Sequence, residues 1–306
     1  MPARILDGKA LAQKVRAEVA ADVRRLVAAG YAQAGGYVVA YVNTVHDALR
    51  LGSGAPVYDA YVDAAGALGS APVNSCATPL PEGDPRRQVV RRDVPVVTLM
   101  SQSDVTRTLW MRRPDSDDEN DVYRLYEIAG AAHVGPFGPG LPSAADLAIA
   151  GVDPSTAVPD CAEPPSSYPV GLALNAIWMQ LDDLLVRGQP MTQASRVDVD
   201  ATGQLVLDAQ GNVQGGLRLP QLDVPLAAYA GTSTPRVGAT GSQPLCALSG
   251  SMRRFDVARL KALYGTRAAY LKRLGAAVDA AVAARGLEPA DAATIRAQAA
   301  KTAPAF

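Results

Sequence analysis

Two residues of this chain have the types and positions of an acid–base pair. The chain has only two histidines, His46 and His133, and histidine is the usual general base near neutral pH. Asp104 and His133 each come just after a segment that we predict to be a strand. Because parallel strands present their carboxyl ends at one edge of a sheet, we expect the Asp104 carboxylate to orient the His133 imidazole.

The spacing of these residues also has a simpler interpretation. Asp104 could cap a turn, and the ring of His133 could be satisfied by backbone groups. His46 follows an apolar, helix-like run and has no acidic partner except the adjacent Asp47, so we interpret it as structural.

Several segments are predicted to position the pair. Residues 94–100 form a continuous apolar run, typical of a buried parallel strand, and residues 122–128 alternate as a second strand. Residues 170–187 are predicted to form a helix that ends at Gly188. Its inward residues are Leu174, Ile177, Leu181, Leu184 and Leu185.

The other segments are predicted as follows. Residues 205–213 indicate a hairpin with its turn near Gly211 and Asn212. Helical spacing over 8–29 puts Leu11, Val15, Val19, Val23 and Leu26 on one face, with Gly30 as a stop. Loops are expected at 65–93 and 134–169, and C-terminal helices at 255–264, 267–285 and 289–301. Residues 37–43 are compatible with a helix or a strand.

Several motifs together resemble a family of bacterial α/β-hydrolase-domain proteins. They are DVPVVTLMSQSDV, RRPDSDDENDVYRLYEIAGAAH, DAQGNVQGGLRLPQLDVPLAAYAG, LCALSGSMRRFD, LKALYGTRAAYLKRL and EPADAATIRAQA. GYAQAGGYVVAYVN, followed by PVYDAYV, resembles that family's nucleophile turn. The likeness runs from about residue 30 to 303 and implies an α/β fold. The implied sheet is an incomplete α/β-hydrolase-like parallel sheet flanked by helices, with a helical C-terminal region.

The resemblance implies a serine hydrolase that acts on an ester-like or amide-like bond. In that scheme Asp104 orients His133, His133 activates the serine, and the backbone N–H of Gln33 contributes to the oxyanion hole. The nucleophile position here is Ala32, which has no reactive oxygen, and no Gly-x-Ser-x-Gly occurs in the chain. Ser53 and Ser251 stand in unrelated contexts and are expected to be surface-loop serines.

The N-terminal segment has a different resemblance. ARILDGKALAQKVRAEVAADVRRLVAAG is similar to the opening of bifunctional methylenetetrahydrofolate dehydrogenase/cyclohydrolase, which implies a first helix. That family needs a Tyr-x-x-x-Lys, but Val62 follows Tyr58 at this spacing and Ala65 follows Tyr61. We therefore expect two parts: an N-terminal helix over 1–30 and an α/β-hydrolase-like domain over 31–306.

The composition of the chain limits the classes of partner that we expect. The net charge of −1 gives no basic field for nucleic acid, and no apolar stretch reaches the ~20 residues that span a bilayer. The first residues lack the apolar core of a signal peptide, so we expect a cytoplasmic protein. No Cys/His metal spacing or cofactor motif occurs, and Cys161 and Cys246 either pair or remain separate thiols.

These observations predict a hydrolase scaffold that keeps the acid and histidine of a triad but is weakly active or inactive. One alternative is a non-catalytic module that binds a small ester-like or amide-like ligand. Another is a folate dehydrogenase relic. A sheet without its first strands exposes an edge, which favours homo-oligomers unless residues 37–43 form a covering strand.

Overall fold

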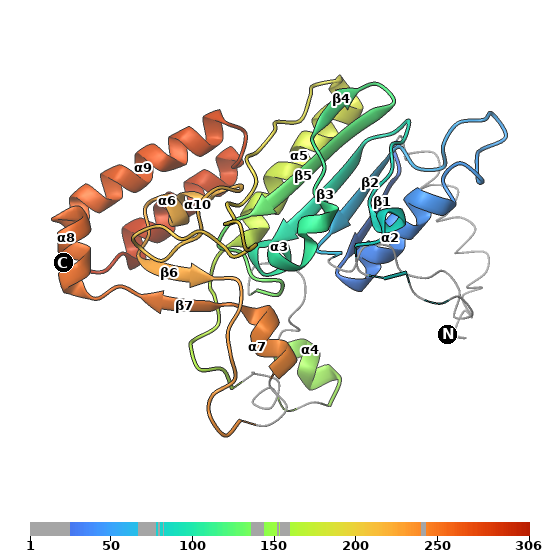
Figure 1. The fold of residues 1–306 in the computed structure, drawn as a ribbon. Coiled ribbons are helices and arrows are strands. Elements are labelled where there is room, and N and C mark those ends of the chain that lie inside the picture. Colours follow the sequence, from blue (N-terminus) through green and yellow to red (C-terminus); the bar gives the residue numbers. More distant parts are fainter. Residues whose placement is uncertain are drawn as a thin grey trace, which may run out of the picture.

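The computed structural model describes residues 25–66, 78, 80–81, 83–135, 144–151, 153, 160–239 and 243–306. Its centre is a five-stranded sheet with the order β1-β2-β3-β5-β4 (Figure 1). The first four of these strands are parallel neighbours, and β4 pairs antiparallel with β5. The strands are β1 (Val27–Tyr31), β2 (Ala60–Ala64), β3 (Val96–Ser101), β4 (Ser116–Asp118) and β5 (Asp121–Ile128). The predicted α/β fold class is confirmed.

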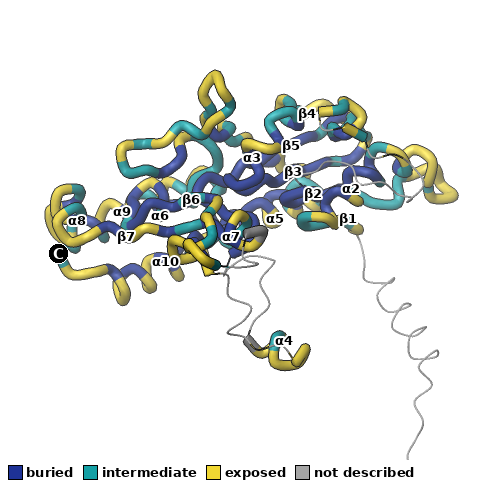
Figure 2. Tube along the Cα trace, turned by 60° about the horizontal axis from the view of Figure 1, so that its bottom comes forward, coloured by how far each residue is buried: buried dark blue, intermediate teal, exposed yellow. Residues whose placement is uncertain are grey.

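Alternate residues of the strands face two different cores, as the period of two requires. In β3, Val96 and Met100 pack with Val39 of helix α2 (Gln33–Thr44), and helix α3 (Gln102–Thr108) covers the same face. Val97 and Leu99 pack instead on the opposite face. Figure 2 shows β2, β3 and β5 as the buried middle of the molecule.

Helix α5 (Val170–Arg187) covers that opposite face. Its predicted bounds and inward face are confirmed: Ile177 and Leu181 are buried against the sheet, with Leu174, Leu184 and Leu185 partly buried beside them. The helix ends at Gly188, whose φ of 68° is the left-handed conformation of a C-cap.

The C-terminal helices are also confirmed. They are α8 (Val257–Tyr264), α9 (Arg267–Ala283) and α10 (Pro289–Thr302), and Figure 1 shows them gathered at one end of the molecule. Asp256 and Thr266 cap α8 and α9 by accepting backbone N–H groups, and Pro289 opens α10.

Shorter elements connect these layers. They are the 3-10 turns η1 (Pro85–Arg87) and η2 (Leu109–Met111), the helices α4 (Ala144–Ile149), α6 (Pro220–Asp223) and α7 (Gln243–Ser249), and the antiparallel strands β6 (Ala227–Ala230) and β7 (Ser251–Arg254). The predicted hairpin is confirmed by the bridge between Leu207 and Val213. Its turn begins at Asp208, whose carbonyl accepts the N–H of Gly211.

The helix predicted over 8–29 is wrong at its C-terminal end. Val27–Tyr31 is strand β1, which pairs in parallel with β2 from Val27 to Tyr31, so Gly30 lies inside a strand. Alanine-rich residues favour a helix locally, but the backbone ladder to β2 overrides that weak preference. A domain boundary after residue 30 would cut through β1. Residues 8–24 lie outside the described residues.

The alternative for residues 37–43 is resolved as helix, within α2. The idea that they form a covering strand is therefore wrong, because β1 is the end strand of the sheet on that side.

The open alternative for the cysteines is resolved as a Cys161–Cys246 disulfide with an S–S distance of 2.06 Å. No helix in the described part of the chain is long and apolar enough to cross a bilayer.

Candidate active site

Ala32 lies at a sharp strand-to-helix turn. It follows β1 directly and is the N-cap of α2, with φ 52° and ψ −122°, a backbone conformation that costs a non-glycine residue about 1–3 kcal/mol. Its N–H donates to the carbonyl of Ala64 at 2.8 Å. Gly30 permits the turn, since a Cβ there would lie 2.3 Å from the carbonyl oxygen of Ala34.

Asp104 lies in the first turn of α3, just past the end of β3. Its Oδ2 accepts hydrogen bonds from the backbone N–H of Ser101 at 3.1 Å and from the Ser101 hydroxyl at 2.6 Å. This capping box fixes the carboxylate in a buried position, and its Oδ1 remains for another partner.

That partner is His133. Its Nδ1 lies 2.9 Å from Oδ1 of Asp104, and both side chains are buried. Because a carboxylate only accepts, Nδ1–H is the donor and Nε2 is left as the acceptor of a proton. The loop turns at Gly130, which has φ 78° and donates its N–H to Oε1 of Gln102 at 2.8 Å.

Tyr31 joins the turn at Ala32 to the histidine loop. Its hydroxyl donates to the carbonyl of His133, and the two rings lie 5.5 Å apart between centroids. Burial, with the Asp104 charge adding to it, raises the pKa of Tyr31 well above its ordinary value, which keeps this hydroxyl a donor. The structure thus brings His133 against Tyr31, the residue that immediately precedes Ala32.

Gln33 follows Ala32 and is the first residue of α2. A backbone N–H in a helix's first turn has no partner within the helix. The Gln33 N–H therefore lies in the first turn of α2, directly after Ala32.

Sequence reasoning missed Asp63 in β2. It is fully buried and pairs in register with Gly30, and neither carboxylate oxygen has a well-formed hydrogen bond in the described part of the chain. Burial raises the pKa of Asp63 to about 7, although the backbone N–H of Gly66 favours the charged form. The only available signal was an acidic residue inside an apolar run.

His46 is buried and fully occupied, which fits its structural interpretation. Its Nδ1 lies 2.8 Å from the Tyr61 hydroxyl, and its Nε2 lies 2.6 Å from Oδ1 of Asp93. The acidic partner is therefore Asp93, and the expectation that only Asp47 was near is wrong. Asp93 could not be recognised as this partner from the sequence, because it lies 47 positions from His46.

Neither Ser53 nor Ser251 contacts the Asp104–His133 pair. Ser53 is exposed in a loop, as expected. The expectation for Ser251 is wrong, because it is half-buried at the start of β7, where its hydroxyl donates to the carbonyl of Thr232 at 3.0 Å. Among the residues that the structure describes, no cluster of His, Cys, Asp or Glu has the arrangement of a metal site.

A parallel sheet with helices on both faces, a strand-to-helix turn and an Asp–His pair at its carboxyl edge define the α/β-hydrolase class. The family model described as "Alpha/beta hydrolase domain" matches residues 8–297, so the chain belongs to this family. The match begins at residue 8 and thus includes most of the segment that the sequence had set apart. No curated protein matches the chain, and no solved structure does so either.

Proposed function

We propose that this protein is an ester- or amide-hydrolase scaffold that keeps the acid and base of a catalytic triad but has Ala32 at the nucleophile position. The observation that carries the proposal is the backbone of Ala32. A non-glycine residue with φ 52° between a strand and a helix has the strained geometry that exposes a nucleophile above a sheet.

The chemistry follows from the contacts of His133. With Nδ1–H donated to Asp104, Nε2 is free to take a proton from a hydroxyl at position 32, and the Gln33 N–H would meet the oxyanion. Ala32 supplies no such hydroxyl. Because loss of the nucleophile lowers kcat by about 10⁶ in a serine hydrolase, the protein is expected to be weakly active or inactive.

The test is Ala32→Ser. Serine fits where alanine already holds the strained φ, so the variant is expected to hydrolyse a p-nitrophenyl ester about 10³-fold or more faster than the unaltered protein. The variant is also expected to react with a fluorophosphonate probe and to take up a single label per chain, on the hydroxyl introduced at position 32.

The matched control is Ala34→Ser, which places a hydroxyl on the exposed first turn of the same helix and is expected to give no turnover and no label. Adding His133→Ala to Ala32→Ser should return the rate to background. A well-folded Ala32→Ser variant with neither turnover nor labelling would refute the assignment of the turn.

The alternative is a non-catalytic module that binds a small ester-like or amide-like ligand beside Ala32. The discriminating measurement compares the unaltered protein with His133→Ala. Weak hydrolysis that His133→Ala removes supports residual catalysis, whereas equal rates in the two proteins favour the binding module.

The third candidate is the folate dehydrogenase relic that the N-terminal resemblance suggested. Its expected reaction, NADP-dependent oxidation of methylenetetrahydrofolate, should be absent. Its detection would revive that candidate.

The cellular compartment and assembly also remain proposals. The Cys161–Cys246 disulfide favours an oxidising compartment over the cytoplasm expected from the N-terminal sequence. Homo-oligomerisation through the β1 edge is tested by sedimentation of the unaltered protein.

A further inference from the structure

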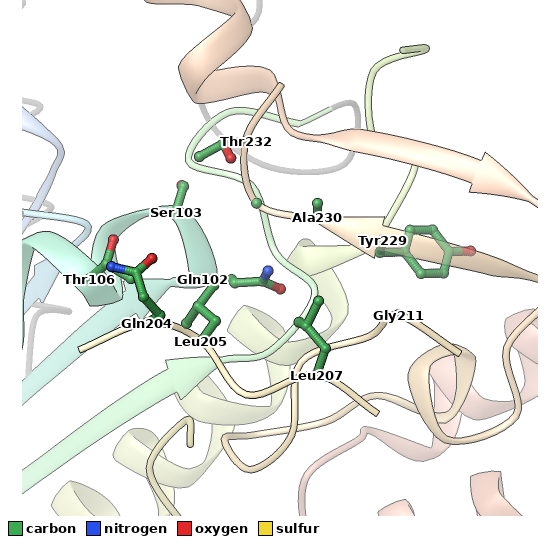
Figure 3. Close-up of a pocket in the computed structure, with 11 residues that line it drawn as sticks. Gln102, Ser103, Thr106, Gln204, Leu205, Leu207, Gly211, Tyr229, Ala230 and Thr232 are labelled. Carbon is green, nitrogen blue, oxygen red and sulfur yellow. The ribbon is translucent and has the colours of Figure 1, made fainter. Parts of the chain in front are cut away.

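A cavity of about 320 Å³ lies between α3 and the end of β6. Its walls come from three places: the first turns of α3, the segment from Gln204 to Gly211, and the end of β6 with the residues after it. Figure 3 shows Gln102, Leu205 and Leu207 extending into the space between α3 and β6. Neither Ala32 nor His133 lines it. Its volume is at the lower end of the range of small-molecule sites, about 300–1,000 Å³.

The chemistry of the walls is polar but uncharged. Amide and hydroxyl groups come from Gln102, Ser103, Thr106, Gln204 and Thr232, beside two leucines and the ring of Tyr229, and no lining side chain carries a charge. An uncharged ligand suits such a site, because a charge taken from water without a partner is costly.

Several of these polar groups are unused. Thr106, Gln204 and Thr232 are exposed, and within the described ranges their side chains make no hydrogen bond, so they are open to a ligand as well as to water. Gln102 uses only its Oε1, which accepts from the N–H of Gly130. The rest of the Gln102 side chain is buried, but its Nε2 is not among the fully buried atoms that lack a partner. Because Gln102 lines the cavity, its Nε2 is a donor that a ligand there could use.

A chain of hydrogen bonds leads from this wall to the histidine. Ser103 Oγ lies 2.7 Å from Ser101 Oγ, Ser101 Oγ donates to Asp104 at 2.6 Å, and Asp104 binds His133. Since Ser101 has one hydroxyl proton and gives it to Asp104, Ser103 must donate to Ser101. The Ser103 oxygen can then accept a hydrogen bond from a ligand in the cavity. Such a bond would polarise the row of hydrogen bonds that leads from Ser103 through Ser101 to Asp104.

We propose that this cavity binds an uncharged, hydroxyl-bearing molecule of about monosaccharide size. Binding would change the hydrogen bond between Asp104 and His133 through Ser103 and Ser101. The hydroxyls meet the unused amides and hydroxyls, and the apolar face of the molecule meets Tyr229 and the leucines. The proposal does not depend on catalysis, because it needs only the Asp104–His133 hydrogen bond.

Binding is tested by calorimetry on the unaltered protein with methyl β-D-glucopyranoside, and with glucose 6-phosphate as the charged comparison. The glucoside is expected to bind in the millimolar range, and the phosphate at least tenfold more weakly. Thr106→Trp should fill the cavity and abolish binding. The matched control is Thr294→Trp, at an exposed threonine of α10, which should bind like the unaltered protein. No glucoside binding, or equal binding by the two tryptophan variants, overturns the proposed site.

Transmission is tested by NMR of the imidazole signals, which are simple to assign because the chain has two histidines. Saturation with the glucoside should shift the His133 signals and leave those of His46 in place. Ser103→Ala removes the relay and one hydrogen bond to the ligand, so it should bind within about tenfold of the unaltered protein and, at saturation, lose the His133 shift. An unmoved His133 at saturation, or an equal shift in Ser103→Ala, overturns the transmission. Because no turnover is measured, these outcomes are independent of the Ala32→Ser result.

Discussion

Asp104 shows how one residue can satisfy two interpretations at once. The sequence left open whether it caps a turn or orients a histidine. Its Oδ2 accepts the Ser101 groups of the capping box, while its Oδ1 accepts Nδ1–H of His133. The cap holds the carboxylate in place, and the held carboxylate then selects the tautomer of the imidazole.

This double contact makes Asp104→Asn informative in the Ala32→Ser background. An amide can present a donor to Nδ1 and so favour the wrong tautomer, and kcat is expected to fall by about 10⁴. The loss of stability should be only about 1 kcal/mol, because the side-chain oxygen of asparagine can still accept hydrogen bonds from the Ser101 groups of the capping box. Ester turnover and urea unfolding measure the two effects.

The matched control is Asp256→Asn, which alters the cap of α8 and should leave kcat unchanged. A rate for Asp104→Asn within tenfold of its parent would contradict the orienting role of Asp104.

Asp63 makes a prediction about pH. Its pKa is raised from 3.8 to about 7 in the folded protein, so between these values the unfolded chain has lost a proton that the folded chain still holds. Stability is therefore lost as the pH rises through this window, and it stays low above it. Asp63→Asn removes the effect and should stabilise the protein by about 2–4 kcal/mol at pH values above the window.

Thermal unfolding at several pH values measures this difference. The gain of Asp63→Asn should shrink toward the acid end of the window, where both states of the parent keep the proton. An exposed counterpart, Asp118→Asn, should show no such trend. A gain that is constant with pH would rule out ionisation of Asp63 as its cause.

At the scale of elements, α5 is the helix whose sequence and packing agree most closely. Leu181 is 1% exposed on the sheet face, whereas Val186, near the end of the same helix, is 59% exposed. Substitutions of these two residues therefore distinguish the effect of burial against the sheet from the effect of a change anywhere in the same helix.

Leu181→Ala is expected to lower the free energy of unfolding by about 3 kcal/mol, because it leaves a void between α5 and the sheet. Val186→Ala should change it by less than about 0.5 kcal/mol. Urea unfolding measures both, and similar losses in the two variants would contradict the packing of α5 on the sheet.

At the scale of the whole molecule, the disulfide joins distant parts of the chain. Cys161 precedes α5 and Cys246 lies in α7, 85 positions later. The carbonyl of Leu248, also in α7, accepts the N–H of Val134, the residue after His133. The bridge thus anchors a helix that contacts the histidine loop.

Replacing both cysteines with alanine is expected to lower the free energy of unfolding by about 4 kcal/mol, because a long loop is no longer closed in the unfolded chain. Urea unfolding with and without a reducing agent measures this loss. The reducing agent should weaken the unaltered protein and leave the double variant unaffected; equal sensitivity of the two would contradict a stabilising bridge.

Local patterns in the sequence were sufficient for β3, β5, α5 and the C-terminal helices, because period and apolar content are properties of one continuous segment. They also placed Asp104 and His133 after neighbouring strands. The motifs further predicted the α/β-hydrolase family, which the family model over residues 8–297 confirms.

Only the tertiary structure decided the features that depend on distant partners. β1 is a strand because β2 lies beside it, although its alanines favour a helix. The pKa of Asp63 is raised to about 7 because the fold buries it. Tyr31 reaches a carbonyl 102 positions away. The pairing of Cys161 with Cys246 likewise depends on where the chain folds back. Such contacts join segments far apart in the chain, and no period within a single segment can encode them.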